Sequence, residues 1–284
     1  MDIDDPIDVD TEMQQPVIPH VFWVPPPSLA EASTGLYDLQ KEGGVIVYTW
    51  KTDNPNARIE PFYNRWPPSR TSVRWCSWIA IDRGWSPYTL SLNPEDAREK
   101  FKNDIDGLQA EFQVLVGGDG QGQGLGSVRV TPEMIDALAV RYGVLGGKWM
   151  IHTDPGRIDQ LWRRVARVVA FDRGYGQLKV SSRKVVEYSQ ESRGQEGSYE
   201  GVALDGGVPV DEKHVICVYV EDYTNKQEVD ELRKALRLGA GVTWRIGFKP
   251  DAYTWLEIYR GNRWGLRPSR YHDNDDVRGE TRRN

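Results

Sequence analysis

The amino-acid sequence predicts an α+β fold in which a curved, mainly antiparallel sheet carries helices on one face. Two observations predict it. Segments with strand-like alternation and segments with helical periodicity follow one another along the chain. Several of the helical segments are short relative to the sheet that the strands would form, which favours helices on one face only.

The helices are predicted from start signals and from apolar stripes. The four predicted starts are Asn93-Pro94, Thr131-Pro132, Asp154-Pro155 and Asn225. A capping side chain before a first-turn proline is typical of a helix start. Glu228 completes a capping box with Asn225. Behind each start, apolar residues recur three or four positions apart, as one buried helix face requires.

The strands are predicted from short runs in which apolar residues alternate with polar ones or are continuous. They cover residues 45–48, 75–81, 148–153, 175–181, 214–221, 242–248 and 256–259. In the run 242–248 and its extension to Lys249, Arg245 and Lys249 share one phase and the apolar residues share the other. Trp75, Trp78, Trp149 and Trp162 have phases that favour burial in the core.

Composition divides the chain into four parts. Residues 1–19 hold six carboxylates and read as a disordered acidic tail. Residues 20–70 are rich in Pro and Trp and are expected to pack on the domain as an arm. The domain itself is placed at 71–271, with a long surface loop at 184–212, and a flexible tail at 272–284.

Bulk properties exclude several classes of protein. The net charge of −6 argues against a protein that coats nucleic acid non-specifically. Cys76 and Cys217 stand outside any Cys/His cluster, so no disulfide framework, metal site or cofactor is expected. The acidic N-terminus lacks targeting signals and no apolar run approaches the roughly 18 residues of a membrane span. We therefore expect a soluble protein of the cytoplasm, or of the cytoplasm and nucleus.

No catalytic motif stands in a supporting context. The glycine-rich stretch 117–126 lacks the Lys-Ser/Thr ending of a phosphate-binding loop, which favours a connector. The four histidines are scattered along the chain, and no pattern pairs a nucleophile with a base. No catalytic residue is assigned, and a binding protein is favoured over an enzyme.

The block from Gly146 to Tyr271 resembles the translation initiation factor 4E fold. The resemblance rests on Gly146-Gly147-Lys148-Trp149-Met150-Ile151, on Ile158-Asp159-Gln160-Leu161-Trp162, and on the order of the elements that follow. The block is more similar to the basophilic leukaemia-expressed protein family, which is grouped by fold with the cap-binding factors. The motifs for this similarity are Gly147-Lys148-Trp149, Lys179-Val180-Ser181, His214-Val215-Ile216-Cys217 and Phe248-Lys249-Pro250-Asp251.

The resemblance implies a ligand site on the sheet. Cap-binding factors hold a methylated guanine between two tryptophans and bind its phosphates with Arg or Lys. Trp85 lies where the first tryptophan would be expected, but the stretch before Gly146 contains no second one. This departure argues against methyl-guanosine as the ligand.

The candidate ligand-binding residues are Trp85, Lys148, Lys179, Arg183, Arg245 and Lys249. Stacking on Trp85 and a convergence of Lys148, Lys179 and Arg183 would suit a nucleotide-like or RNA-end ligand. The alternative for the cations is ordinary solvated charge, and for Trp85 a loop tryptophan that covers the core.

Two alternatives to such a binding protein stay open. The protein could be an interaction adaptor that uses the arm 20–70 or the helical face with Arg157, Arg163, Arg164 and Arg167. It could also be an unrecognised enzyme. The sequence leaves the oligomeric state undetermined.

Overall fold

The computed structural model describes residues 37–42, 45–51, 58–84, 94–117, 129–187, 207–209 and 213–272, and the structural statements below concern these residues. Trp85 and the acidic tail 1–19 lie outside them. No helix of this part of the chain is long and apolar enough to cross a membrane.

The centre of the fold is an open eight-stranded sheet in the order β1-β2-β3-β5-β8-β4-β9-β10. Its strands are β1 (Asp38–Glu42), β2 (Val45–Lys51), β3 (Trp78–Asp82), β4 (Gly147–Thr153), β5 (Gln177–Ser181), β8 (His214–Val220), β9 (Gly247–Pro250) and β10 (Tyr271–His272). Neighbours pair antiparallel except β2 and β3, which are parallel. A separate hairpin joins β6 (Val185–Glu187) and β7 (Gly207–Pro209). The predicted α+β class with a mainly antiparallel sheet is confirmed.

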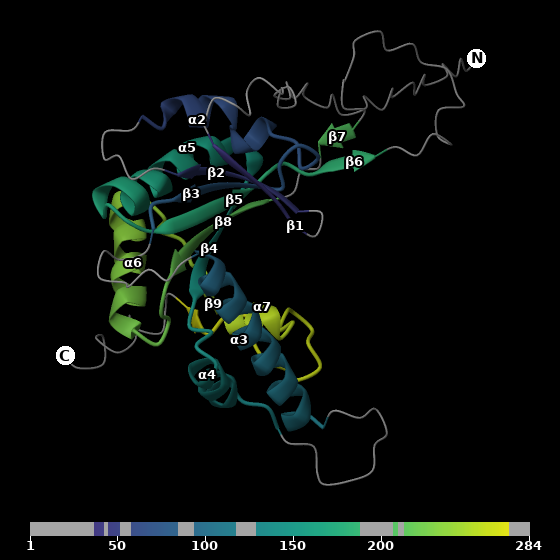
Figure 1. Cartoon of the computed structure of the whole chain (residues 1–284). Coiled ribbons are helices and arrows are strands. Elements are labelled where there is room, and N and C mark those ends of the chain that lie inside the picture. Colours follow the sequence, from purple (N-terminus) through teal and green to yellow (C-terminus); the bar gives the residue numbers. More distant parts are fainter. Residues whose placement is uncertain are drawn as a thin grey trace, which may run out of the picture.

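The helices form two groups (Figure 1). They are α2 (Glu60–Arg65), the 3₁₀ turn η1 (Pro68–Arg70), α3 (Pro94–Leu115), α4 (Pro132–Arg141), α5 (Pro155–Ala166), its π-helical continuation η2 (Arg167–Asp172), α6 (Lys226–Gly239) and α7 (Asp251–Trp255). The helices α2, α5 and α6 lie along one face of the sheet, whereas α3, α4 and α7 gather beside β9.

Two of the predicted helix starts are confirmed by their caps. The Thr131 side chain accepts a hydrogen bond from the Met134 amide at the start of α4. The Asn225 side chain accepts one from the Glu228 amide at the start of α6, at 3.3 Å. Each cap satisfies one of the amides that the first turn leaves without an intrahelical partner.

The main core lies between the sheet and α5 and α6. Along β4, Trp149 and Ile151 are buried whereas Lys148 and Met150 are only half-buried, because successive side chains of a strand point to opposite faces. The Trp149 indole N–H donates to the Val229 carbonyl oxygen of α6 at 3.1 Å. This bond satisfies the one polar atom of a large buried ring.

The segment assigned to an arm contributes directly to the sheet. Its predicted strand 45–48 is part of β2, and β1 pairs with β2 at the sheet edge. Trp66 is fully buried, with ring centroids of Tyr48 and Tyr37 at 4.5 and 5.5 Å. The aromatic residues that the structure describes in this segment therefore belong to the core.

One predicted strand is confirmed only at its end, and another is wrong. The run 242–248 enters the sheet only at Gly247, because the Arg233 guanidinium donates to the carbonyl oxygens of Val242 and Trp244 at 2.9 and 3.1 Å. Those acceptors would otherwise be available to a neighbouring strand. Residues 256–259 form a turn after α7, in which the Ile258 amide donates to the Tyr253 carbonyl oxygen.

Candidate functional site

The face of the sheet opposite α5 and α6 carries a cluster of cations and aromatic rings. We call it the lysine face and define it by Trp78, Lys148, Lys179, Tyr219 and Lys249. These residues come from β3, β4, β5, β8 and β9, which adjoin one another in the sheet. Strand pairing, rather than nearness in sequence, brings them together.

The register of the strands places the three lysines close to one another. Lys148 lies directly opposite Lys249 on β9 and opposite Tyr219 on β8. Lys179 pairs with Cys217, two residues before Tyr219 on the same face of β8. Side chains directly opposite one another have Cβ atoms about 4.5–5.5 Å apart, so Lys148 and Lys249 are close neighbours of like charge.

Aromatic rings lie against all three ammonium groups. The Lys179 Nζ lies 4.4 Å from the ring centroid of Trp78 and 5.6 Å from that of Tyr219. The Lys148 Nζ lies 5.5 Å from the Tyr219 centroid. The Lys249 Nζ lies 3.7 Å from the Tyr259 centroid. Such contacts stabilise a partly desolvated cation by about 0.5–2 kcal/mol.

Among the described residues, the carboxylate of Asp251 lies in the cluster and forms an ion pair with Lys148. The Lys148 Nζ donates to Asp251 Oδ1 at 2.5 Å and to Thr254 Oγ1 at 3.2 Å, both on α7. Gly146 permits this approach, because a Cβ there would lie 2.8 Å from Asp251 Oδ2. The Asp251 amide also donates to the Gly146 carbonyl oxygen at 2.7 Å, which fixes the start of α7 against β4.

Burial weakens the charged form of two of these lysines. Lys249 is only 3% exposed, and its burial, followed by the neighbouring charge of Lys148, lowers the pKa of its ammonium group to about 8, while Asp251 opposes the shift. Burial is also the main cause that lowers the pKa of Lys179. Burial raises the pKa of the Tyr219 phenol and of the Cys217 thiol, so both stay neutral.

The structure places Arg183 and Arg245, the other candidate residues that it describes, away from this cluster. Arg183 follows β5 and its Nη1 contacts the Ser69 carbonyl oxygen at 3.4 Å, while Ser69 hydrogen-bonds Asp159 of α5. Arg183 therefore belongs to the side of the sheet that α5 covers, and does not converge with Lys148 and Lys179. Arg245 is exposed in the segment before β9, outside the strand phase that it was expected to share with Lys249.

Sequence reasoning missed three aromatic residues that contact the lysines of this face. Trp78 was expected in the core, but it is only half-buried and lies beneath Lys179, because Ile79 and Ile81 take the core phase of β3. Tyr219 has the phase opposite to Ile216, Val218 and Val220, which are buried, and this alternation could have indicated an outward position. Tyr259 lies in a turn, and no periodic signal predicts its contact with Lys249. Trp149 and Trp162 are buried as predicted.

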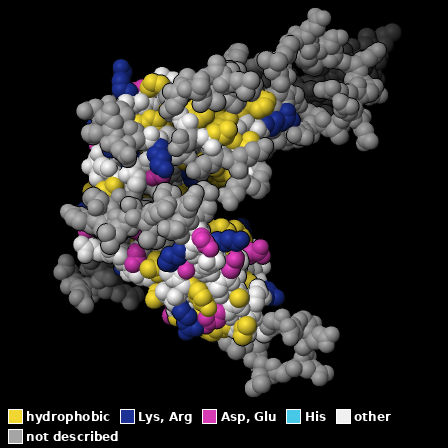
Figure 2. Space-filling model, in the orientation of Figure 1, with side chains coloured by type: hydrophobic (Ala, Val, Ile, Leu, Met, Phe, Trp, Pro, Cys, Tyr) yellow, Lys and Arg dark blue, Asp and Glu magenta, His cyan; other side chains and the backbone are white. Residues whose placement is uncertain are grey.

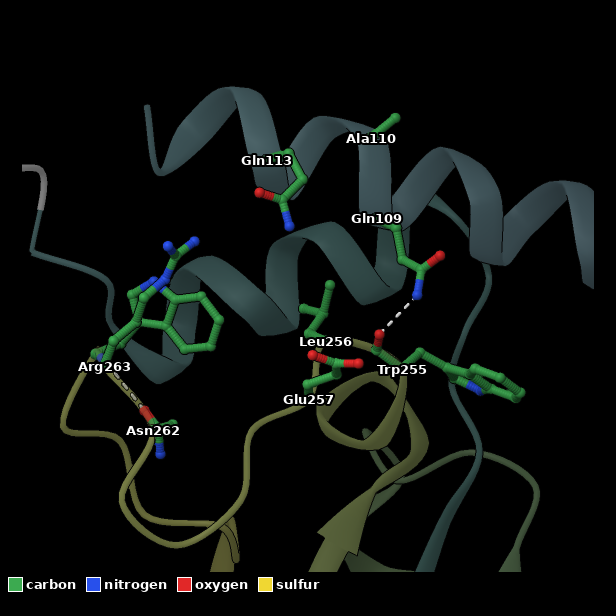
Figure 3. A pocket seen from close by; sticks show the side chains of 9 residues that line it. Gln109, Ala110, Gln113, Trp255, Leu256, Glu257, Asn262 and Arg263 are labelled. Atoms are coloured by element: carbon green, nitrogen blue, oxygen red, sulfur yellow. Dashed lines mark hydrogen bonds between the residues drawn. The ribbon is translucent and has the colours of Figure 1, made fainter. Parts of the chain in front are cut away.

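A concave feature lies apart from the lysine face, between α3 and the turn after α7 (Figure 3). It is an open groove of about 730 Å³, lined by Gln109, Ala110, Gln113, Trp255, Leu256, Glu257, Asn262, Arg263 and Trp264. Gln109 Nε2 donates to the Trp255 carbonyl oxygen at 2.8 Å, and Glu257 has a left-handed backbone with φ of 55°. None of the sequence-predicted site residues that the structure describes lines this groove.

The surface of α3, α4 and α7 differs in charge from the lysine face. Acidic and basic side chains are mixed over it (Figure 2). Several are paired, as in Lys100 with Asp104, Arg141 with Glu111, and Arg270 with Asp136. The lysine face, in contrast, gathers three cations around one carboxylate. In the described part of the chain, no group of three or more His, Cys, Asp or Glu could hold a metal ion.

Fold and site together define an α+β protein whose open sheet carries a basic, aromatic-lined face. A family model described as "Basophilic leukemia-expressed protein Bles03" matches residues 127–193. The matched segment contains α4, β4, α5 and β5, and with them Lys148 and Lys179. The match confirms, for this segment, the relationship to the basophilic leukaemia-expressed protein family that its lysine-containing motifs predict.

Proposed function

We propose that this protein is a non-catalytic binding protein that holds a phosphate-bearing, nucleotide-like or RNA-end ligand on the lysine face. One observation carries the proposal: Lys148 and Lys249 on the paired strands β4 and β9, and Lys179 on β5 one strand beyond β8, lie around Asp251, a carboxylate that Lys148 already binds. Ammonium groups gathered in a partly desolvated site favour an anion, and phosphate oxygens accept charge-assisted hydrogen bonds from them.

The aromatic residues suit the remainder of such a ligand. Trp78 and Tyr219 lie beside the ammonium groups, and a base has a π-face that can stack on such rings. The net charge of −6 is compatible with the proposal, because a local basic site can stand on an acidic body. A cap-binding-like scaffold that lacks the second sandwich tryptophan would bind a ligand other than methyl-guanosine.

Tryptophan fluorescence tests the proposal directly. GTP, a cap analogue and a short 5′-phosphorylated RNA are titrated separately into the full chain. A ligand beside Trp78 is expected to change the emission, with GTP or the RNA binding more tightly than the cap analogue. The proposal is wrong if none of the three changes the emission at millimolar concentration.

Lys179→Met is the variant of choice, because Lys179 has no carboxylate in ion-pair contact among the described residues. Loss of one charge-assisted hydrogen bond costs about 1.5–3 kcal/mol, so affinity should fall about tenfold or more. Lys234→Met is the matched control, since Lys234 is exposed on α6 beyond the opposite face of the sheet. It should leave affinity unchanged.

A second candidate function is that of an adaptor for an acidic protein partner. Arg157, Arg163, Arg164 and Arg167 are all exposed on α5 and its continuation. Two of them have partners within the chain: Arg163 donates to Asn64 Oδ1 at 3.0 Å, and the Arg167 Nε lies 3.8 Å from Asp172. Calorimetry with a polyglutamate peptide tests this function, and Arg157→Ala with Arg164→Ala should abolish any binding.

A further inference from the structure

Lys249 is buried and has no ion-pair partner among the described residues. Its residue is 3% exposed, yet no carboxylate of the described residues lies within ion-pair distance of its Nζ. The Asp251 carboxylate acts on Lys249 from a distance, but its Oδ1 already accepts the hydrogen bond from Lys148. A buried ammonium group in this position is destabilised relative to the neutral amine.

The groups around Lys249 come from every element packed against it. Lys148 faces it from β4, Asp251 from α7 and the Tyr259 ring from the turn after α7. On the other side, β10 brings His272 opposite Gly247, two residues before Lys249 on the same face of β9. The like charge of Lys148 disfavours the ammonium form, whereas Asp251 and the ring favour it.

The charge of the lysine face therefore depends on the state of Lys249. With Lys249 neutral, the cluster contains the two cations Lys148 and Lys179 and the carboxylate of Asp251, so its net charge is +1. With Lys249 protonated, its net charge is +2. A dianion would balance the second state, and its own charge would favour the proton on Lys249.

We infer that the lysine face binds a dianionic group, such as a terminal phosphate monoester, and that Lys249 takes up a proton as this group binds. Uptake rests on the proposed function, because it needs an anion on this face. It extends that function by naming the charge of the ligand and the residue that adapts to it. An internal phosphodiester, with one negative charge, would recruit the proton less strongly.

Calorimetry on the full chain measures the uptake. Guanosine 5′-monophosphate is titrated at pH 8.5, above the second phosphate ionisation at about 6, so the ligand itself binds no proton. Repeating the titration in buffers with different ionisation enthalpies gives the number of protons taken up. With a pKa of about 8, about three quarters of the Lys249 amines are neutral at this pH, which sets the expected uptake. Sulfate, a dianion over this range, is the second probe.

Lys249→Arg separates Lys249 from the other groups, since arginine stays protonated and takes up nothing. The wild-type chain should take up about three quarters of a proton and K249R close to none, with Lys234→Arg as the control. Wild-type affinity should also fall, by up to tenfold per pH unit, above pH 8.

Three results overturn the inference. Binding without uptake in the wild-type chain refutes it and leaves the proposed function intact. Equal uptake in K249R assigns the proton to another group, such as Lys179. If neither probe binds, the proposed function falls together with the inference. Should K249R fail to fold, the wild-type pH profile decides alone: affinity that stays constant from pH 8 to 9.5 refutes the uptake.

Discussion

Replacing Lys249 by Met should change how the stability of this protein depends on pH. The folded state lowers the pKa of Lys249 from 10.5 to about 8. At pH 7, below both values, the buried ammonium group carries its full penalty. Each pKa unit corresponds to 1.36 kcal/mol, so the penalty is about 3 kcal/mol.

The direction in which stability changes with pH follows from the number of protons that the folded and unfolded chains bind. Between pH 8 and 10.5 the unfolded chain holds a proton on Lys249 that the folded chain has released. Stability therefore rises with pH in this window, and about 2 kcal/mol of the penalty should disappear between pH 7 and 9.5. Met removes both the penalty and the contact with Tyr259, which is worth about 0.5–2 kcal/mol. The K249M chain should be about 1–2.5 kcal/mol more stable than wild type at pH 7.

Urea unfolding at pH 7 and 9.5 measures the effect. The gap between K249M and wild type should shrink by about 2 kcal/mol at the higher pH, whereas Lys234→Met should show no such change. The comparison between two pH values cancels any packing difference introduced by Met. If K249M and wild type gain or lose stability in parallel from pH 7 to 9.5, the ammonium group of Lys249 is not destabilised by burial, and the reasoning is refuted.

Three further expectations concern the ligand, the core and α7. A 5′-phosphorylated oligonucleotide should bind about tenfold tighter than its 5′-hydroxyl form, and Lys179→Met should remove most of the difference in a fluorescence competition; equal affinities would contradict a terminal phosphate as the recognised group. Trp149→Ala should cost about 3–5 kcal/mol in urea unfolding, because it empties a buried site, and a loss below 1 kcal/mol would place the ring outside the core. Gly146→Ala should destabilise by about 1–3 kcal/mol by displacing Asp251, whereas Gly156→Ala on α5, where an added Cβ meets no atom within 4 Å, should stabilise slightly; equal effects of the two would show that Asp251 yields without cost.

Local signals made much of this fold predictable. Thr131 and Asn225 cap their helices as expected because a cap depends on residues within one turn. The strand 242–248 failed because Arg233, on the preceding helix, takes the carbonyl oxygens of that run. A side chain that competes for backbone acceptors leaves no trace in the alternation of apolar residues.

The candidate site was predictable only in part for the same reason. Lys148 and Lys179 each lie in a sequence motif of the family. The pairing of Lys148 with Lys249, in contrast, depends on the contact between β4 and β9, which are about a hundred residues apart in the sequence. Trp78 was misplaced because alternation gives two faces and does not say which of them is covered. The three-dimensional pairing decides both questions.

The strand order also bears on the route by which the chain folds. β4 lies between β8 and β9, both of which come much later in the sequence, and β5 pairs with β3 from before α3 and α4. Contacts between distant residues require large loops to close first, which slows folding. We expect the β1–β2 hairpin to form early, because its strands adjoin in sequence. The central strands, and with them the pairing of Lys148 on β4 with Lys249 on β9, should form last.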